Sequence, residues 1–466
     1  MNFKSIFFYL GKINLLIVLF SFFNILYCYY FDFKINLSIY FITFLLSLLF
    51  YLVTFRINGN HKNLKSESLI CFALIGWMAL PLLMSIPFWL GNYANFLNAY
   101  FETMSGFTSF GASIFDKKLH TLDAPILLWR NSTQIIGAVF FVVTIILVLG
   151  NRDINLYPLK FIEKKKDPFD FSVNFSNVYN NTVYAFSIAF LISLFFLNFT
   201  DLRMLDKFNL SLSIISTGGF EISTLYLKNY EKIIISFLLI FSSLNIFLIL
   251  GFLKINNTYH YYEDKYFLIT FSFFLLIIIF FNQNVNFSDS LIQLSSAISN
   301  SGINFTNRNY ENIVFVLLSA SFFGGCLISS TSGFKISRIL IIFNKIYYEL
   351  LKLLTPSAVI NSKIFKSNEK IENRDFYSSC LLLLFYIIFF IIFSFVLTFE
   401  NISFQDSFLT SVLLTFNTAP SSMYLSGNID FSKFSNFSLI FSIIMLILSK
   451  VTPLTLIALI KYRFIK

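Results

Sequence analysis

The chain has 466 residues, of which 57% are hydrophobic and 12% are charged, and its mean hydropathy is +0.74. One water-soluble core could not bury so much apolar surface, so the composition excludes a soluble globular protein. The formal net charge of +10 would suggest nucleic acid as the partner of a soluble chain. In a membrane protein it follows instead from the retention of basic residues on the cytoplasmic side. We therefore predict an all-α polytopic membrane protein that contacts lipids and binds no nucleic acid.

Ten apolar stretches are long enough, at about 20 residues each, to cross a bilayer. In chain order they lie near residues 13–31, 36–55, 68–90, 125–150, 178–199, 230–254, 264–282, 312–347, 375–398 and 433–460. The first stretch runs into the second without a small-residue cleavage site, so we expect no cleavable signal peptide. Basic residues gather in the segments that lie inside if the N-terminus is inside, which predicts that both termini are cytoplasmic.

Between alternate pairs of stretches lie four shorter, more polar segments, near 96–111, 203–218, 287–302 and 402–419. Each ends in a turn, and the turns read Thr108-Ser109-Phe110-Gly111, Ile215-Ser216-Thr217-Gly218, Ser299-Asn300-Ser301-Gly302 and Phe416-Asn417-Thr418-Ala419. Fifteen residues before the end of the first, third and fourth turns stand Phe96, Phe287 and Phe404, which indicates a repeated unit. Irregular backbone at membrane depth persists only where protein or a water-filled cavity satisfies its polar groups. The four turns therefore predict one shared central pore.

The chain thus divides into two N-terminal transmembrane helices and four pseudo-repeated units, each made of a span, a pore half-helix, a loop and a second span. The helix pair takes residues 1–60, and the units take 61–165, 166–258, 259–350 and 351–466. The largest inner loops, 151–177 and 348–374, are either docking surfaces for a cytosolic partner or solvated linkers.

A dehydrated monovalent cation needs a ring of oxygen atoms, and backbone carbonyls supply it where the chain adopts dihedral angles that glycine tolerates. The turns place the ion-binding candidates at Thr108, Ser109, Phe110, Gly111, Ser216, Thr217, Gly218, Asn300, Ser301, Gly302, Asn417, Thr418 and Ala419.

Two further features lie within apolar stretches. One is a run of small residues in the third unit, which is either a helix-packing surface or a non-helical intramembrane loop: Gly324, Gly325, Ser329, Ser330, Thr331, Ser332 and Gly333. Four consecutive hydroxyl side chains would face lipid poorly, which favours the loop. The other is Lys450, where a charge costs roughly 2.5 to 3.5 kcal/mol at the bilayer centre. We expect Lys450 to face the cavity and to act as an electrostatic barrier.

Several of these motifs resemble the TrkH/KtrB/HKT superfamily of potassium transporters. Glu102-Thr103-Met104-Ser105-Gly106-Phe107-Thr108-Ser109-Phe110-Gly111-Ala112-Ser113 is similar to the first pore loop of the family, and Trp129-Arg130-Asn131-Ser132-Thr133-Gln134 to the start of its next helix. Ser216-Thr217-Gly218-Gly219-Phe220 resembles the second loop. Gly324-Gly325-Cys326 and Ser329-Ser330-Thr331-Ser332-Gly333-Phe334-Lys335 resemble the broken helix of the third unit. The two leading helices fit the TrkH branch.

The resemblance implies a potassium uptake subunit of the bacterial inner membrane that binds K+ in its filter and has no covalent cofactor. It also implies a homodimer, a cytosolic nucleotide-binding regulatory subunit of the TrkA/KtrA kind, and a gating role for residues 324–333. At the position of Lys450, TrkH-like proteins have an arginine.

The sequence departs from the family at three tips. The fourth loop has Asn417-Thr418-Ala419-Pro420-Ser421 where Asn-x-Gly-Pro-Gly is usual, Phe110 replaces a threonine, and Asn300-Ser301 stands where Thr-Thr is common. The β-carbon of Ala419 disfavours left-handed dihedral angles by about 1 to 2 kcal/mol. Sodium transport, weak K+/Na+ selectivity and a non-conducting paralogue are therefore alternatives. A polytopic membrane enzyme would need clustered Asp, Glu or His at one membrane face, and the sequence has no such constellation.

Overall fold

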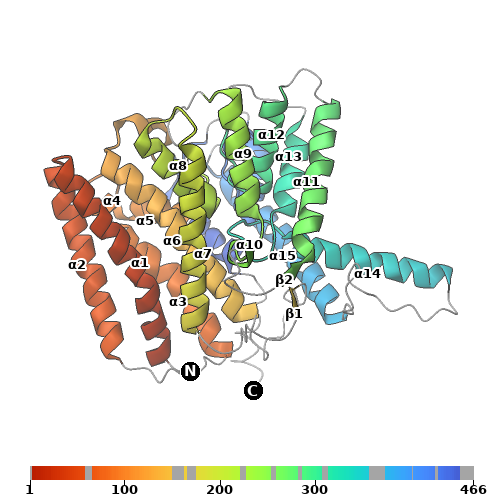
Figure 1. Cartoon of the computed structure of the whole chain (residues 1–466), viewed down its shortest axis with the longest axis horizontal. Coiled ribbons are helices and arrows are strands. Elements are labelled where there is room, and N and C mark those ends of the chain that lie inside the picture. Colours follow the sequence, from red (N-terminus) through yellow and green to blue (C-terminus); the bar gives the residue numbers. More distant parts are fainter. Residues whose placement is uncertain are drawn as a thin grey trace.

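The computed structural model describes residues 3–57, 66–149, 162–164, 175–220, 227–252, 259–281, 286–306, 313–355, 373–400, 402–425 and 429–451. Within these ranges the protein is almost entirely helical, as predicted from its composition (Figure 1). The two short strands β1 (Ile162–Lys164) and β2 (Tyr259–Tyr261) form one antiparallel pair, in which Glu163 lies opposite His260.

Two long helices, α1 (Phe3–Tyr30) and α2 (Lys34–Arg56), form an antiparallel pair at one side of the molecule (Figure 1). Their outer surfaces are apolar, whereas polar groups lie between them: the Asn14 side-chain amide donates to the carbonyl oxygen of Ser47 at 2.6 Å. Apolar outside and polar inside is the arrangement expected in lipid, where helices associate through small and polar side chains. The pair packs on the first unit through α3 and α6.

Four units follow in chain order, and each contains one half-helix of 12 or 13 residues. The first contains α3 (Ser66–Met84), α4 (Ile86–Leu90), α5 (Phe96–Phe107) and α6 (Ala124–Leu149); the second contains α7 (Phe175–Leu197), α8 (Met204–Ser216), α9 (Asn229–Ser243) and α10 (Leu248–Phe252). The third contains α11 (Tyr262–Phe281), α12 (Phe287–Ile298), α13 (Val314–Phe323) and α14 (Ile336–Leu354); the fourth contains α15 (Asn373–Thr398), α16 (Phe404–Phe416) and α17 (Asn436–Lys450). The half-helices are α5, α8, α12 and α16.

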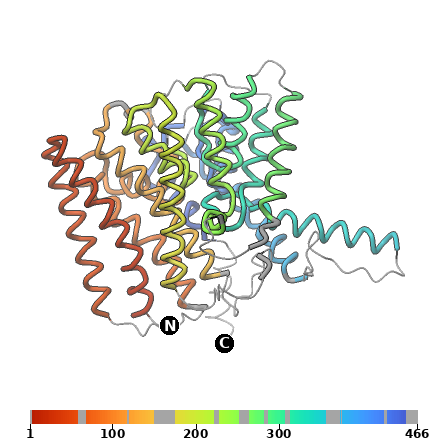
Figure 2. Tube along the Cα trace, viewed as in Figure 1, coloured from red at the N-terminus to blue at the C-terminus, as the bar shows by residue number. Residues whose placement is uncertain are grey.

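The units close into a ring because the helix that follows each half-helix packs against the half-helix of the next unit. Helix α6 packs on α8, α9 on α12, α13 on α16, and α17 on α5. Figure 2 shows how the blue fourth unit lies behind the yellow and green second and third units. The contact of α17 with α5 joins segments more than 300 residues apart and completes the cycle.

Seven of the described helical segments are long and apolar enough to cross a membrane. Three of the ten predicted spans differ from this. The stretch 230–254 is interrupted between Ser243 and Leu248, so α9 covers its first part and the short helix α10 follows the interruption. The stretch 312–347 is interrupted between Phe323 and Ile336, after which α14 runs sideways out of the helix bundle (Figure 1). In the last stretch α17 is a shorter helix that ends at Lys450, and residues 452–466 lie outside the described part.

Candidate functional site: the four half-helix tips

All four half-helices end in the same turn. One residue of each turn has a left-handed backbone, with φ of 60° at Ser109, 50° at Thr217, 62° at Asn300 and 56° at Asn417. It is the third residue of the second turn as predicted and the second residue of the other three. In three turns the next amide donates to the carbonyl five residues earlier, as from Phe110 to Ser105 at 2.8 Å. The same pairing joins Gly218 to Ser213 at 2.8 Å and Thr418 to Leu413 at 2.9 Å. A repeated left-handed cap satisfies the last carbonyls of a helix that ends inside protein.

The left-handed residues set the register among the four tips. Two residues after each of them stand Gly111, Gly219, Gly302 and Ala419. In this register the second tip ends at Gly219, one position beyond the predicted Gly218, which aligns with Phe110 instead. Counting back fifteen residues from Gly219 reaches Met204, the first residue of α8. The offset could have identified Gly219, but methionine stands there in place of the phenylalanine that marks the other three units.

The four tips meet at one place. A Cβ atom on Gly111 would overlap the Cα atom of Gly219, and one on Gly302 would lie 2.6 Å from the carbonyl oxygen of Ala419. A Cβ atom on Gly219 would overlap the methyl group of Ala419 and lie 2.6 Å from the carbonyl oxygen of Ser301. First, second, third and fourth units therefore contribute to one cluster, and only glycine fits at three of its positions.

The tips have two backbone conformations rather than one. Gly111 and Gly302 have φ of 82° and 65°, whereas Gly219 and Ala419, both in the described part, lie outside the left-handed region. The Ala419 methyl group therefore does not force left-handed strain on the fourth tip. Its consequence is steric, because it fills the space opposite Gly219.

Two asparagine side chains tie neighbouring tips together. Asn417 donates from its amide to the carbonyl oxygen of Thr108. Asn300 donates to the hydroxyl of Thr418 at 2.9 Å and to the carbonyl oxygen of Ser321 at 2.8 Å. Both side chains are fully buried, so these hydrogen bonds form away from water and fix the relative positions of the tips.

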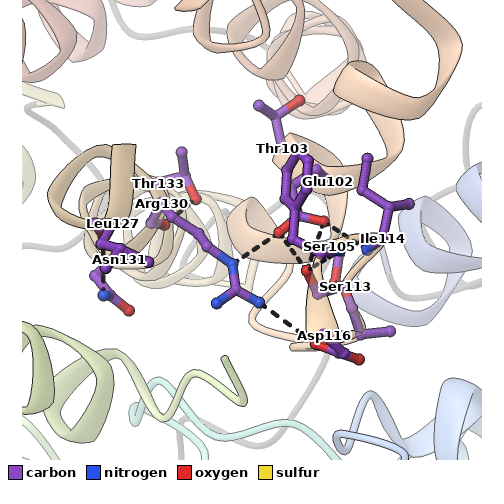
Figure 3. A network of polar contacts seen from close by, with 12 residues as sticks. Glu102, Thr103, Ser105, Ser113, Ile114, Asp116, Leu127, Arg130, Asn131 and Thr133 are labelled. Atoms are coloured by element: carbon purple, nitrogen blue, oxygen red, sulfur yellow. Dashed lines mark hydrogen bonds and ion pairs between the residues drawn. The ribbon is translucent and has the colours of Figure 1, made fainter. Parts of the chain in front are cut away.

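A buried ion pair supports the first loop (Figure 3). Glu102 on α5 accepts from the Arg130 Nε atom at 2.7 Å, from the Ser113 hydroxyl at 2.8 Å and from the backbone amide of Ile114 at 2.9 Å. Arg130 also stacks on Phe220, 3.9 Å from its ring centroid, and so reaches the second loop. Gln293, at the equivalent position of α12, donates to the Thr306 hydroxyl at 2.8 Å. The chain that leaves the tip is thus braced in both units.

The break in the third unit, residues 324–335, lies against the cluster of tips. The Ser330 hydroxyl donates to the carbonyl oxygen of Ile215 at 2.9 Å. The amide of Gly333 donates to the carbonyl oxygen of Phe416 at 3.1 Å. These carbonyls belong to the ends of α8 and α16, which lie in alternate units of the ring. The break therefore spans from the second half-helix to the fourth.

Lys450 approaches the same break. Its ammonium group donates to the Ser332 hydroxyl at 2.6 Å and lies 4.3 Å from the ring centroid of Phe141. Ser332 also accepts from the Asn417 amide at 3.1 Å. Ser332 thus connects Lys450 to the fourth tip, although the break that contains Ser332 belongs to the third unit and Lys450 to the fourth. Among the described residues, no group of three or more His, Cys, Asp or Glu side chains could hold a metal ion.

The comparisons with known proteins agree with this geometry. No family model matches the chain. The Trk system potassium uptake protein TrkG of Escherichia coli is 25% identical over 374 residues, 74% of this chain and 75% of that protein. An uncharacterized cation transporter of Methanocaldococcus jannaschii is 27% identical over 311 residues, and the matched part spans just under two thirds of it, 64%, and 65% of this chain.

The crystal structure of the potassium transporter TrkH from Vibrio parahaemolyticus has the same fold, with a TM-score of 0.81 at 19% identity and 98% of each chain covered. The chain is a relative of the Trk potassium uptake proteins. The resemblance seen in the pore-loop motifs is confirmed, and the Trk-like chain is a multi-pass membrane protein. Its relatives are transporters rather than enzymes.

Proposed function

We propose that this Trk-like chain is the ion-translocating subunit of a potassium uptake system and conducts K+ inward through the four tips. The observation that carries the proposal is the meeting of Gly111, Gly219, Gly302 and Ala419 at one place. Half-helices that end around a common point bring backbone carbonyls together there, and carbonyl oxygens can replace the hydration shell of K+. Residues 324–333 would gate the pore and Lys450 would limit leak.

The remaining parts of the assembly are proposed from the resemblance to Trk proteins. They comprise a bacterial inner-membrane location with cytoplasmic termini, a homodimer, and a nucleotide-binding cytosolic subunit. The candidate docking segments 151–177 and 348–374 lie mostly outside the described residues. Of the first, the structure describes only strand β1 and the start of α7.

Growth of a potassium-uptake-deficient bacterium tests the function directly. Expression of the chain should restore growth at micromolar to millimolar potassium, and added sodium should not inhibit it. A Gly302→Asp variant, which puts a carboxylate beside the fourth tip, should reach the membrane but fail to rescue. Equal rescue by that variant would contradict a filter at the tips.

Sodium conduction is the second candidate, and the Ala419 methyl group is the observation that favours it. The methyl group narrows the meeting point opposite Gly219, and a narrower ring of ligands favours a smaller cation in the view that selectivity follows cavity size. Growth rescue that sodium inhibits would support this candidate over potassium uptake.

A further inference from the structure

Two adjacent carboxylates at the start of α11 bind backbone outside their own helix. Glu263 and Asp264 are only 7% and 8% exposed. Acidic residues in a first helical turn commonly interact with the free amides of that turn. Here the Glu263 carboxylate accepts from the amide of Leu327 at 2.8 Å, across 64 positions of sequence. The contact is with the break in the third unit, residues 324–335.

Asp264 joins that break to the interruption that follows α9. Its Oδ1 atom accepts from the amide of Asn245 at 2.9 Å and from the thiol of Cys326 at 3.2 Å. The two irregular segments also pair directly, because the amide of Cys326 donates to the carbonyl oxygen of Ser243 at 2.9 Å. The backbone that leaves each helix is therefore satisfied by the other segment and by the two carboxylates.

Lys335 donates hydrogen bonds to acceptor oxygen atoms of the break. Its ammonium group donates to the carbonyl oxygen of Cys326 at 3.0 Å and to the Thr331 hydroxyl at 2.9 Å. Carboxylates thus hold amides of the break while a cation holds its oxygen atoms. Hydrogen bonds to charged groups are roughly twice as strong as neutral ones, so this end of the break is its most firmly held part.

We propose that Glu263 and Asp264 are positioning residues that hold the intramembrane break against the half-helix tips and so set how often the pore opens. The inference rests on the proposed conducting function and on the gating role of the break. Glu263 follows β2 with only Tyr262 between them, and β2 pairs with β1. Strand β1 lies in the segment 151–177, one of the two candidate docking segments for a cytosolic partner. A displacement of the strands would therefore move both carboxylates and break their hydrogen bonds with the Leu327 amide and the Cys326 thiol.

Single-channel recording of the purified full chain in planar bilayers tests the proposal. Glu263→Ala removes the acceptor of the Leu327 amide and should raise the open probability about tenfold, the ratio expected for losing one charge-assisted hydrogen bond. Glu263→Gln keeps an oxygen acceptor without the charge and should give an intermediate value. The K+/Na+ reversal potential should stay unchanged, because the tips are untouched.

Glu231 provides a matched control. It is as buried as Glu263 and also accepts from backbone amides, those of Asp201 and Lys228, both at 2.8 Å, but it does so at the start of α9, away from the break. Glu231→Ala should leave the open probability unchanged. An equal rise in both variants would overturn the proposal and point to general loosening of the bundle.

Cys326 gives a second measurement that does not need current. It is fully buried beside Asp264, so a charged thiol reagent should label it slowly in the unaltered chain and faster in Glu263→Gln. Cys28, Cys71 and Cys380 would be replaced by serine in every variant. Unchanged labelling together with an unchanged open probability overturns the proposal. A chain that carries no cation current in any form overturns the conducting function instead.

Discussion

The glycines at the tips differ in what surrounds them, and this difference yields the most direct residue-scale prediction. Gly219→Ala would place a methyl group against Ala419 and 2.6 Å from the Ser301 carbonyl oxygen. We expect K+ flux into vesicles to fall about tenfold or more, because relieving such overlap requires strained backbone at the filter. Gly251→Ala is the control, since no described atom lies within 4 Å of its added Cβ. Equal flux in the two variants would mean that Gly219 lines no pore.

Ala419 offers the converse change. Ala419→Gly removes the methyl group that fills the space opposite Gly219. We expect a rise in K+ over Na+ selectivity, because the wider meeting point favours the larger cation in the view that selectivity follows cavity size. Reversal potentials under mixed ions measure it. The control is Ala185→Gly, which removes a buried methyl group from α7, a helix that carries none of the four tips. If both variants keep the original selectivity, the fourth tip tolerates alanine.

Lys450 combines a charge with a hydrogen bond, and two substitutions separate them. Lys450→Gln removes the charge but can still donate to Ser332, so conductance should increase several-fold if a fixed positive charge in a poorly hydrated cavity repels cations. Lys450→Met removes both and should also loosen the break at Ser332. Lower conductance of Lys450→Gln at normal expression would contradict the barrier and leave only the anchoring role.

At the scale of elements, the brace between α5 and α6 predicts stability rather than selectivity. Glu102→Ala removes the buried partner of the Arg130 Nε atom and leaves the longer contact with Asp116 at 3.8 Å. Breaking a buried ion pair typically costs about 3 to 5 kcal/mol. We expect a clearly lower melting temperature in detergent. The control is Lys228→Ala, which breaks an exposed pair with Asp201, because exposed pairs contribute only about 0 to 1 kcal/mol. Similar melting of both variants would show that the brace is not structural.

The half-helices show how far the sequence predicts these elements. Phe96, Phe287 and Phe404, inferred from a constant offset, are the first residues of α5, α12 and α16. The offset worked because each helix needs the same length to reach a common point from the membrane surface. The interruption after Ser243 was not predicted. No glycine or proline lies between Ser243 and Leu248 to mark it, and Asp264, which satisfies the Asn245 amide, stands 19 positions later.

At the scale of the whole molecule, four divergent units form a closed ring, and the contact of α17 with α5 completes it. The number of units and their order followed from the turns, because irregular backbone in a membrane has to share a protein-lined interior. The contacts between units could not be predicted from the sequence. The bond from Asn300 to Thr418 and the approach of Lys450 to Ser332 connect residues 118 positions apart, and no local pattern records such pairs.

The central claim is that the ring of four tips conducts potassium. Ion flux by the purified chain in sealed vesicles, with potassium and sodium gradients imposed in turn, tests it most directly. We predict inward K+ movement that follows the potassium gradient, that falls about tenfold or more in Gly219→Ala and that Gly251→Ala preserves. Potassium flux that survives Gly219→Ala at full rate, or no cation flux from folded chain with its cytosolic partner present, would contradict the account.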